Sequence, residues 1–251
     1  MNVQDFLYKK YVFYLLFQKI CPHQIFVVPL RAFLTKMNIF IAYWKSVSGE
    51  EKANTLTHLL SLIGAIAISW PLLRLAMVAN AYAVAGIILF IIGMLQMFAS
   101  STIYHAVTVP VHKARLRIFD HISIYVMIAG SYSPICLYVV GGWVGWTLFG
   151  FLWACVVVGM ITKFVALGKH PHLSLALYLA MGWVALLILK PMWLNLPNTA
   201  FWLIVAGGIS YTVGTYFFHG DETHSYWHAI WHVFITLGAL CHTIAFWLML
   251  S

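Results

Sequence analysis

The stretch Tyr226–Leu250, YWHAIWHVFITLGALCHTIAFWLML, decides the fold class of this chain. It holds no lysine, arginine, aspartate or glutamate over a length that exceeds the roughly 20 residues an α-helix needs to cross a bilayer. Two histidines, His228 and His232, stand near its start. Residues four apart on a helix lie on one face, about one turn and ~6 Å from each other, so both imidazoles can reach one metal ion. The stretch predicts a transmembrane helix with a metal site at one end, and the spacing suits zinc.

Six further apolar runs of transmembrane length precede this stretch. Of the 251 residues, 63% are hydrophobic and 8% are charged, whereas charged residues make up about a quarter of a soluble domain. The runs show no alternation of apolar and polar residues, which argues against a membrane β-barrel. We therefore predict an all-α integral membrane protein, a seven-transmembrane helical bundle with short connections and antiparallel neighbours. The predicted spans are 54–75, 81–106, 118–140, 144–167, 173–189 (closed by Pro191), 199–218 and 226–250.

The first 47 residues differ in composition from the rest of the chain. They mix aromatic residues with single lysines and arginines, and Arg31 and Lys36 would be costly in the middle of a bilayer. We therefore predict a basic, aromatic juxtamembrane segment over residues 1–47, followed by a seven-helix membrane domain over residues 48–251. An extra span over residues 25–44 and a true start at Met37 remain alternatives.

The orientation follows from counting lysines and arginines by loop. With the N-terminus inside, twelve of the 14 fall on the cytoplasmic side, and two, Arg74 and Lys190, fall outside. The positive-inside rule therefore predicts a cytoplasmic N-terminus and, with seven spans, a C-terminus outside, in a multi-pass protein of the inner or plasma membrane. The basic residues occur singly between apolar runs and form no basic face, so we expect membrane lipids and no nucleic acid as partners.

Ionisable residues in the predicted spans converge on one leaflet. In this topology His58, His105, Asp120 and the pair His228 and His232 all lie at the cytoplasmic ends of their helices. Asp120 is the sole carboxylate between Glu51 and Asp221. An ionised carboxylate near hydrocarbon needs a partner or a polar cavity, which makes these positions candidates for function.

These residues supply the parts of a catalytic zinc site. Such a site uses three protein ligands and an open position for water, and His105, His228 and His232 can be the three ligands. Asp120 is then left either to ligate the metal directly or to hold and deprotonate the metal-bound water. Ser101 precedes His105 by four residues on the same helical face, so its hydroxyl can donate to an oxyanion or orient the water.

Other polar residues have simpler interpretations. For His58 and for His242 an interhelical hydrogen bond is favoured over a metal site. His121 points about 100° away from Asp120 on a helix, so a histidine at headgroup level is favoured. The loop before the last span is expected to be a solvated polar turn, although it could weakly chelate metal; its polar residues are His219, Asp221, Glu222 and His224.

The combined motifs resemble the haemolysin III branch of the progestin and adipoQ receptor (PAQR) superfamily. The resemblance rests on Glu51-x2-Asn54-x3-His58, Ser101-x3-His105, Asp120-His121-Ile122-Ser123-Ile124-Tyr125, Ala180-Met181-Gly182-Trp183 and His228-x3-His232. It covers about residue 48 to the end. It implies seven helices with the N-terminus inside and zinc near the cytoplasmic face. The implied zinc ligands are His105, His228 and His232, with Asp120 contacting zinc through water and Ser101 beside it. It also implies receptor, ceramide-cleaving, haemolytic or membrane-lipid homeostasis functions, as in members of the superfamily.

Four functions remain open from the sequence. The first is an intramembrane zinc hydrolase that cleaves an amide or ester of a lipid, with Asp120 as general base and Ser101 at the oxyanion. The second is a non-enzymatic sensor of membrane state in which zinc staples helices together. A pore-forming cytolysin is disfavoured because no helix carries a continuous polar row. A proton-coupled transporter is disfavoured because nothing marks a second gate.

Overall fold

The computed structural model describes residues 35, 37, 42–166 and 171–251. Within these residues, seven helical stretches are long and apolar enough to cross a membrane. The prediction of an all-helical, multi-pass membrane protein with seven spans is confirmed, whereas its orientation stays a prediction. The stretches are Gly49–Ala79, Ala81–Ala106, Pro110–Val140, Gly142–Val165, Ser174–Asn195, Asn198–His219 and Trp227–Leu250.

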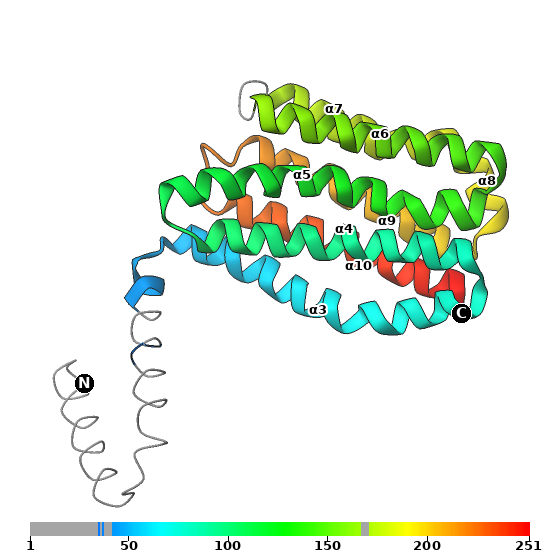
Figure 1. Ribbon diagram of the computed structural model, residues 1–251, viewed down its shortest axis with the longest axis horizontal. Coiled ribbons are helices and arrows are strands. Elements are labelled where there is room, and N and C mark those ends of the chain that lie inside the picture. The colour runs from blue at the N-terminus through cyan, green and yellow to red at the C-terminus, as the bar shows by residue number, and fades with distance from the viewer. Residues whose placement is uncertain (1–34, 36, 38–41, 167–170) are drawn as a thin grey trace, which may run out of the picture. The chain divides into compact units, whose positions relative to one another are not determined.

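Five of the spans are single α-helices, and two are composite. The single helices are α3 (Gly49–Ala79), α4 (Ala81–Ala106), α6 (Gly142–Ala166), α9 (Asn198–His219) and α10 (Trp227–Leu250). The third span joins α5 (Pro110–Pro134) to a π-helical turn, η1 (Ile135–Val140). The fifth span joins α7 (Pro171–Trp183), the 3-10 segment η2 (Val184–Ile188) and α8 (Leu189–Asn195). Long helices lie side by side in the unit Gly49–Ser251 (Figure 1).

Two predicted helix boundaries are wrong. The third span begins at Pro110 and not near residue 118, because proline suits the first helical turn, where its missing N–H is not needed. Lys113, Arg115 and Arg117 therefore lie on helical turns and not in a loop. Pro191 does not close the fifth span either. It sits in the first turn of α8, where it costs no backbone hydrogen bond, and that helix continues to Asn195.

Helix α5 is the centre of the unit. Its span is the most deeply buried of the seven, and it packs against α4, α6 and α7. Glycines allow its close approach to α4: a Cβ atom on Gly86 would lie 2.6 Å from the Cα atom of Pro134, and one on Gly130 would lie 2.8 Å from the carbonyl oxygen of Leu89. Small residues at such crossings let transmembrane helices approach closely. Both faces of α5 consequently meet other helices.

Helix α3 lies at the edge of the unit, and its buried polar residues are near its start. It packs against α4 and α10, and α10 also packs against α9. Its first three turns bury the polar residues Asn54, Thr55 and His58. Its Glu50 carboxylate accepts the backbone N–H of Tyr226 at 2.8 Å, at the residue with φ 63° that precedes α10. The start of α3 therefore holds the start of α10 in place.

The N-terminal predictions remain untested. Most of the possible extra span over residues 25–44 lies outside the described residues. The boundary between residues 1–47 and 48–251 and a start at Met37 stay predictions.

Candidate metal centre

Three histidines from two helices meet at one end of the bundle. His105 lies in the last turn of α4, and His228 and His232 lie in the first two turns of α10. Each offers a ring nitrogen, and these atoms all lie within 4.8 Å of one another. The ring centroids are 4.7 to 5.1 Å apart. His105 and His232 are buried, and His228 is partly exposed. The three residues predicted as ligands are thus brought together, in a group that could hold a metal ion.

Each of the three imidazoles has its Nδ1 atom against an oxygen acceptor. His105 Nδ1 lies 2.7 Å from Glu51 Oε2, and His228 Nδ1 lies 2.6 Å from Asp221 Oδ2. His232 Nδ1 lies 3.2 Å from the carbonyl oxygen of Asn54. Donation of Nδ1–H to these acceptors fixes the tautomer and leaves the Nε2 lone pair available. Metal-binding histidines are held in this way by their outer-shell partners.

The Nε2 atoms show that the site fits a metal ion. Those of His105 and His228 are buried and have no hydrogen-bond partner among the described residues. That of His232 lies 3.5 Å from the Ser101 hydroxyl. A buried nitrogen without a partner is costly, and here unsatisfied nitrogens gather at one point. A cation that accepts their lone pairs removes this cost, and imidazole nitrogen suits several transition metals, zinc among them.

The polar face of α3 supports the group from one side. Glu51, Asn54 and His58 recur at helical spacing on this face. Glu51 also pairs with Lys113 of α5 at 2.9 Å. Thr57 places its hydroxyl oxygen 3.1 Å from His232 Nδ1, as a second acceptor beside the Asn54 carbonyl. This helix contributes acceptors and no metal ligand.

Ser101 and Asp120 lie beside the three histidines. Both are buried. The Asp120 side chain interacts with Ser101 and is an electrostatic neighbour of His228. Its carboxylate does not belong to the group of mutually close ligand atoms found in the described residues. This arrangement favours a role next to a bound ion over direct ligation, and the roles of both residues stay predictions.

The remaining predicted histidines have different outcomes. The interhelical hydrogen bond predicted for His242 is confirmed, because its Nε2 lies 3.3 Å from the carbonyl oxygen of Ile204. The one predicted for His58 is wrong. Both of its ring nitrogens lack a partner in the described residues, and the ring stacks on His232 with centroids 3.6 Å apart. His58 is buried by ring packing, and the polar acceptors of α3 go to other histidines.

The sequence interpretation missed the roles of two carboxylates. Asp221 was expected in a solvated turn, but it is largely buried and pairs with His228, seven residues further along the chain. Glu51 was noted within a motif and given no role. The available signal was chemical: a metal-binding histidine needs an acceptor for its second nitrogen, and this chain has just six carboxylates.

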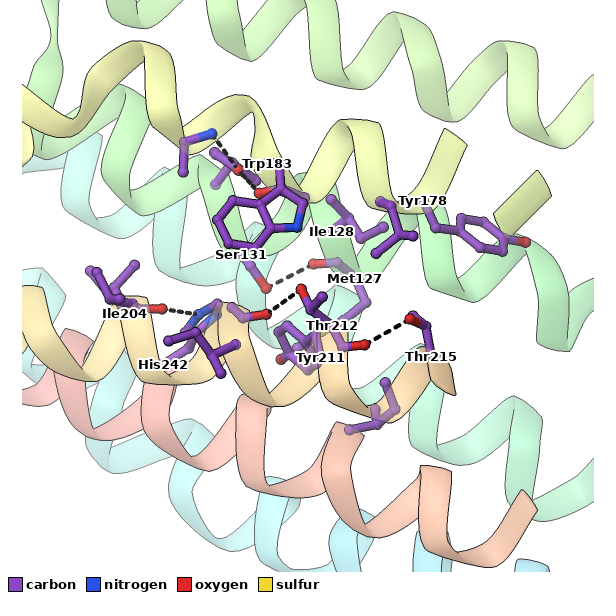
Figure 2. Close-up of a pocket in the computed structure, with 18 of the residues that line it drawn as sticks. Met127, Ile128, Ser131, Tyr178, Trp183, Ile204, Tyr211, Thr212, Thr215 and His242 are labelled. Carbon is purple, nitrogen blue, oxygen red and sulfur yellow. Dashed lines mark hydrogen bonds between the residues drawn. The ribbon is translucent and has the colours of Figure 1, made fainter. Parts of the chain in front are cut away.

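An apolar cavity of about 420 Å³ lies next to the metal centre, between α5, α7, α9 and α10. In Figure 2, Met127, Ile128, Trp183 and Ile204 line it together with the polar residues Ser131 and Thr212. Trp231 also belongs to its wall, and the indole ring of Trp231 packs against His228 and His232 with centroids 4.9 and 5.3 Å apart. The cavity wall thus continues into the histidine group.

The chain is similar to proteins of one family. A family profile described as Haemolysin-III related matches residues 48–243, which include the whole metal centre. The chain is 35% identical over 191 residues to the hemolysin-3 homolog of Bacillus subtilis (strain 168), which is 76% of this chain and 89% of that protein. It is 34% identical over 211 residues to hemolysin-3 of Bacillus cereus, 82% of this chain and 91% of that protein.

A human protein is similar over a comparable share of the chain. Human monocyte to macrophage differentiation factor is 29% identical over 212 residues, 81% of this chain and 86% of that protein. No solved structure is significantly similar to the chain.

Proposed function

This chain belongs to the Haemolysin-III related family, and from that premise we propose that it is a zinc-dependent hydrolase of membrane lipids. The substrate is a lipid amide or ester, and the protein serves membrane-lipid homeostasis. The buried three-histidine group carries the proposal, because unsatisfied Nε2 atoms converge there while the Nδ1 atoms are occupied. Three ligands leave one position open, which is typical of catalytic zinc, whereas structural zinc has four protein ligands.

The residues around the open position have distinct roles. Zinc, when bound, lowers the pKa of its water to about 7 and polarises a carbonyl group. Asp120 accepts a proton from the attacking water and returns it to the leaving nitrogen or oxygen as the carbonyl carbon gains the hydroxyl. Ser101 donates a hydrogen bond to the oxygen on which negative charge develops. Ser101 and His228 are the neighbours of the Asp120 side chain on the side of the metal centre.

The apolar cavity supports a lipid as the substrate. Its lining is almost entirely hydrocarbon and aromatic, and Trp231 connects it to the histidine group. A hydrocarbon chain in this cavity places its polar head at the level of the metal ligands. Proximity of this kind supplies much of the rate enhancement of an enzyme.

The proposed orientation puts the metal centre at the cytoplasmic leaflet. Lys113 at the start of α5 pairs with Glu51, the partner of His105, so the first turns of α5, with Arg115 and Arg117, lie at the end of the bundle that holds the metal centre. Arg74 lies near the far end of α3, and Lys190 in α8 lies at the opposite end. This distribution supports a cytoplasmic N-terminus in the inner or plasma membrane.

The test is lipid turnover by the purified, zinc-loaded protein in nanodiscs. The wild-type protein and an Asp120→Asn variant are incubated with lipid amides and esters, and the products are measured by mass spectrometry. We expect Asp120→Asn to lower turnover by about 10²- to 10⁴-fold, with zinc content unchanged. Glu222→Gln, which changes an exposed carboxylate, is the control and should turn over normally.

Three outcomes would contradict the proposal. Equal turnover by Asp120→Asn would remove Asp120 as the base. Stoichiometric zinc with no product from any lipid would favour a sensor in which zinc joins α4 and α10. Liposome leakage that persists after replacement of all three histidines would favour a cytolysin.

A further inference from the structure

A second polar cluster lies on the side of α5 that packs against α6 and α7. Its centre is Lys163, three residues before the end of α6, with 5% of its surface exposed. The Lys163 ammonium donates a hydrogen bond to Ser174 Oγ at 2.7 Å. It also lies 5.7 Å from the ring centroid of Tyr178. Both partners are neutral, so the charge of this buried lysine is not balanced by either.

Two further basic side chains from α5 lie near Lys163. Arg117 and His121 are both electrostatic neighbours of its ammonium. The Nδ1 atom of His121 is buried and has no hydrogen-bond partner in the described part of the chain. Tyr178 donates its hydroxyl to the backbone oxygen of His121 at 3.1 Å, which ties α7 to this turn of α5. In Figure 2 the Tyr178 hydroxyl points away from the apolar cavity. Two helices thus gather basic groups at one place.

Among the described residues, no acid pairs with Lys163. No aspartate or glutamate occurs between Asp120 and Asp221 in the sequence. The ion pairs found among the described residues use Glu51 and Asp221, both at the metal centre. Asp120 interacts with Ser101, His228, Arg117 and Lys113. In the described part of the chain, the charged group that acts on Lys163 is the cationic Arg117.

This arrangement favours an anion from outside the chain. A buried ammonium is costly when it is unpaired, and a like charge nearby adds to that cost. Lys163 lies one turn from the end of a transmembrane helix, which is the depth of lipid phosphates. Basic pockets between transmembrane helices at this depth suit anionic headgroups. Phosphate oxygens accept charge-assisted hydrogen bonds from both ammonium and guanidinium groups.

We propose that Lys163 and Arg117 bind a phosphate group carried by an anionic phospholipid, with Ser174 and Tyr178 positioning the lysine. The site is separate from the metal centre and goes beyond the proposed hydrolase. It makes the stability of the bundle depend on the charge of the surrounding lipid. If the phosphate site proves wrong, the proposals on zinc binding and lipid turnover still stand. If the hydrolase proves wrong, the phosphate site still stands.

The experiment compares thermal unfolding of the full chain in two kinds of nanodisc, phosphatidylcholine alone and phosphatidylcholine mixed with phosphatidylglycerol. Wild-type protein should gain about 3 °C or more in the mixed bilayer. Lys163→Met keeps the aliphatic stem and removes the charge, and it should lose most of this gain. In phosphatidylcholine alone the variant should be at least as stable as wild type, so the order of stability reverses between the bilayers. Lys190→Met, at the other end of the bundle, should keep the full gain.

Two controls are needed: one distinguishes lipid phosphate from free phosphate, and the other distinguishes phosphate binding by Lys163 from a purely structural role. Millimolar inorganic phosphate in phosphatidylcholine nanodiscs should give a small shift; a shift equal to that of phosphatidylglycerol would overturn the lipid as the source. An equal loss of stability for Lys163→Met in both bilayers would show a packing role and overturn the site. If Lys163→Met does not fold, Arg117→Gln, which changes an exposed side chain, should lose part of the gain, and a full gain in that variant would contradict the proposal.

Discussion

Two polar clusters lie on either side of α5, and they differ in the charged groups that they contain. We call them the histidine cluster, which is the candidate metal centre, and the lysine cluster, which is centred on Lys163. On the side of α3, α4 and α10, histidines are paired with Glu51 and Asp221, and Asp120 lies beside them. On the side of α6 and α7, Lys163 lies with Arg117 and with neutral hydroxyl groups. The two clusters meet at consecutive residues of α5. Asp120 interacts with Ser101 and His228 and also with Arg117, whereas His121 is an electrostatic neighbour of Lys163.

The difference shows what each cluster lacks. The histidine cluster has its acids, and its His105 and His228 Nε2 atoms have no partner among the described residues. In the lysine cluster, no described acid pairs with Lys163. Buried polar groups that the chain leaves unsatisfied indicate a partner from outside. We therefore expect variants on the two sides to respond to different additions, metal on one side and anionic lipid on the other.

Removal of a metal ligand should have the largest effect on the histidine cluster, measured as the zinc bound per chain. We expect His228→Ala and His232→Ala to lose essentially all bound zinc, because two imidazoles hold the ion far more weakly than three. Metal content per chain, measured by plasma mass spectrometry after purification without chelator, checks this. His242→Gln on the same helix is the matched control and should retain its zinc. Full zinc content in both alanine variants would contradict the assigned ligands.

Removal of the carboxylate partners should have a smaller effect. In Glu51→Gln and Asp221→Asn, a neutral amide oxygen replaces the carboxylate that accepts Nδ1–H, so the imidazole becomes a weaker ligand. We expect zinc affinity to fall by about 10- to 100-fold in each variant. Competition with a fluorescent chelator gives the affinity, and Glu222→Gln should leave it unchanged. Affinities equal to wild type in both variants would mean that these carboxylates do not support the site.

The smallest effect is expected at His58. Its ring nitrogens have no partners in the described residues, so His58→Leu removes an unsatisfied polar group and keeps an apolar side chain of similar size. We expect unchanged zinc content and a melting temperature equal to or slightly above that of wild type. Loss of zinc in this variant would instead make His58 a fourth ligand and close the coordination site.

The spans and the grouping of the three histidines could be predicted from the sequence because both depend on local pattern. Hydropathy located the seven helices, and the spacing of His228 and His232, with His105 at the same depth, placed the three rings together. The partners of the Nδ1 atoms depend on which helix packs beside each ring and on side-chain rotamers, which spacing does not encode. Asp221 was misjudged for this reason, since a short polar loop gives no sign that it folds back onto His228.

The lysine cluster was missed for a related reason. Lys163 was counted as one of the basic residues that mark the cytoplasmic side, a property that depends on its depth alone. Its burial follows from the packing of α6 against α5 and from its contact with Ser174 of α7. The scarcity of acids between Asp120 and Asp221 acquires meaning only with this burial in view. The signal was in the sequence, but its interpretation needed the helix neighbours.

Zinc K-edge X-ray absorption of the purified protein tests the central claim most directly. We predict one zinc ion per chain with three imidazole nitrogens and one further light atom at about 2.0–2.1 Å, the pattern of an open catalytic site. The imidazole contribution should fall in a His105→Ala variant reloaded with zinc. A spectrum with four protein ligands in the wild type, or a protein that binds no zinc, would contradict the account.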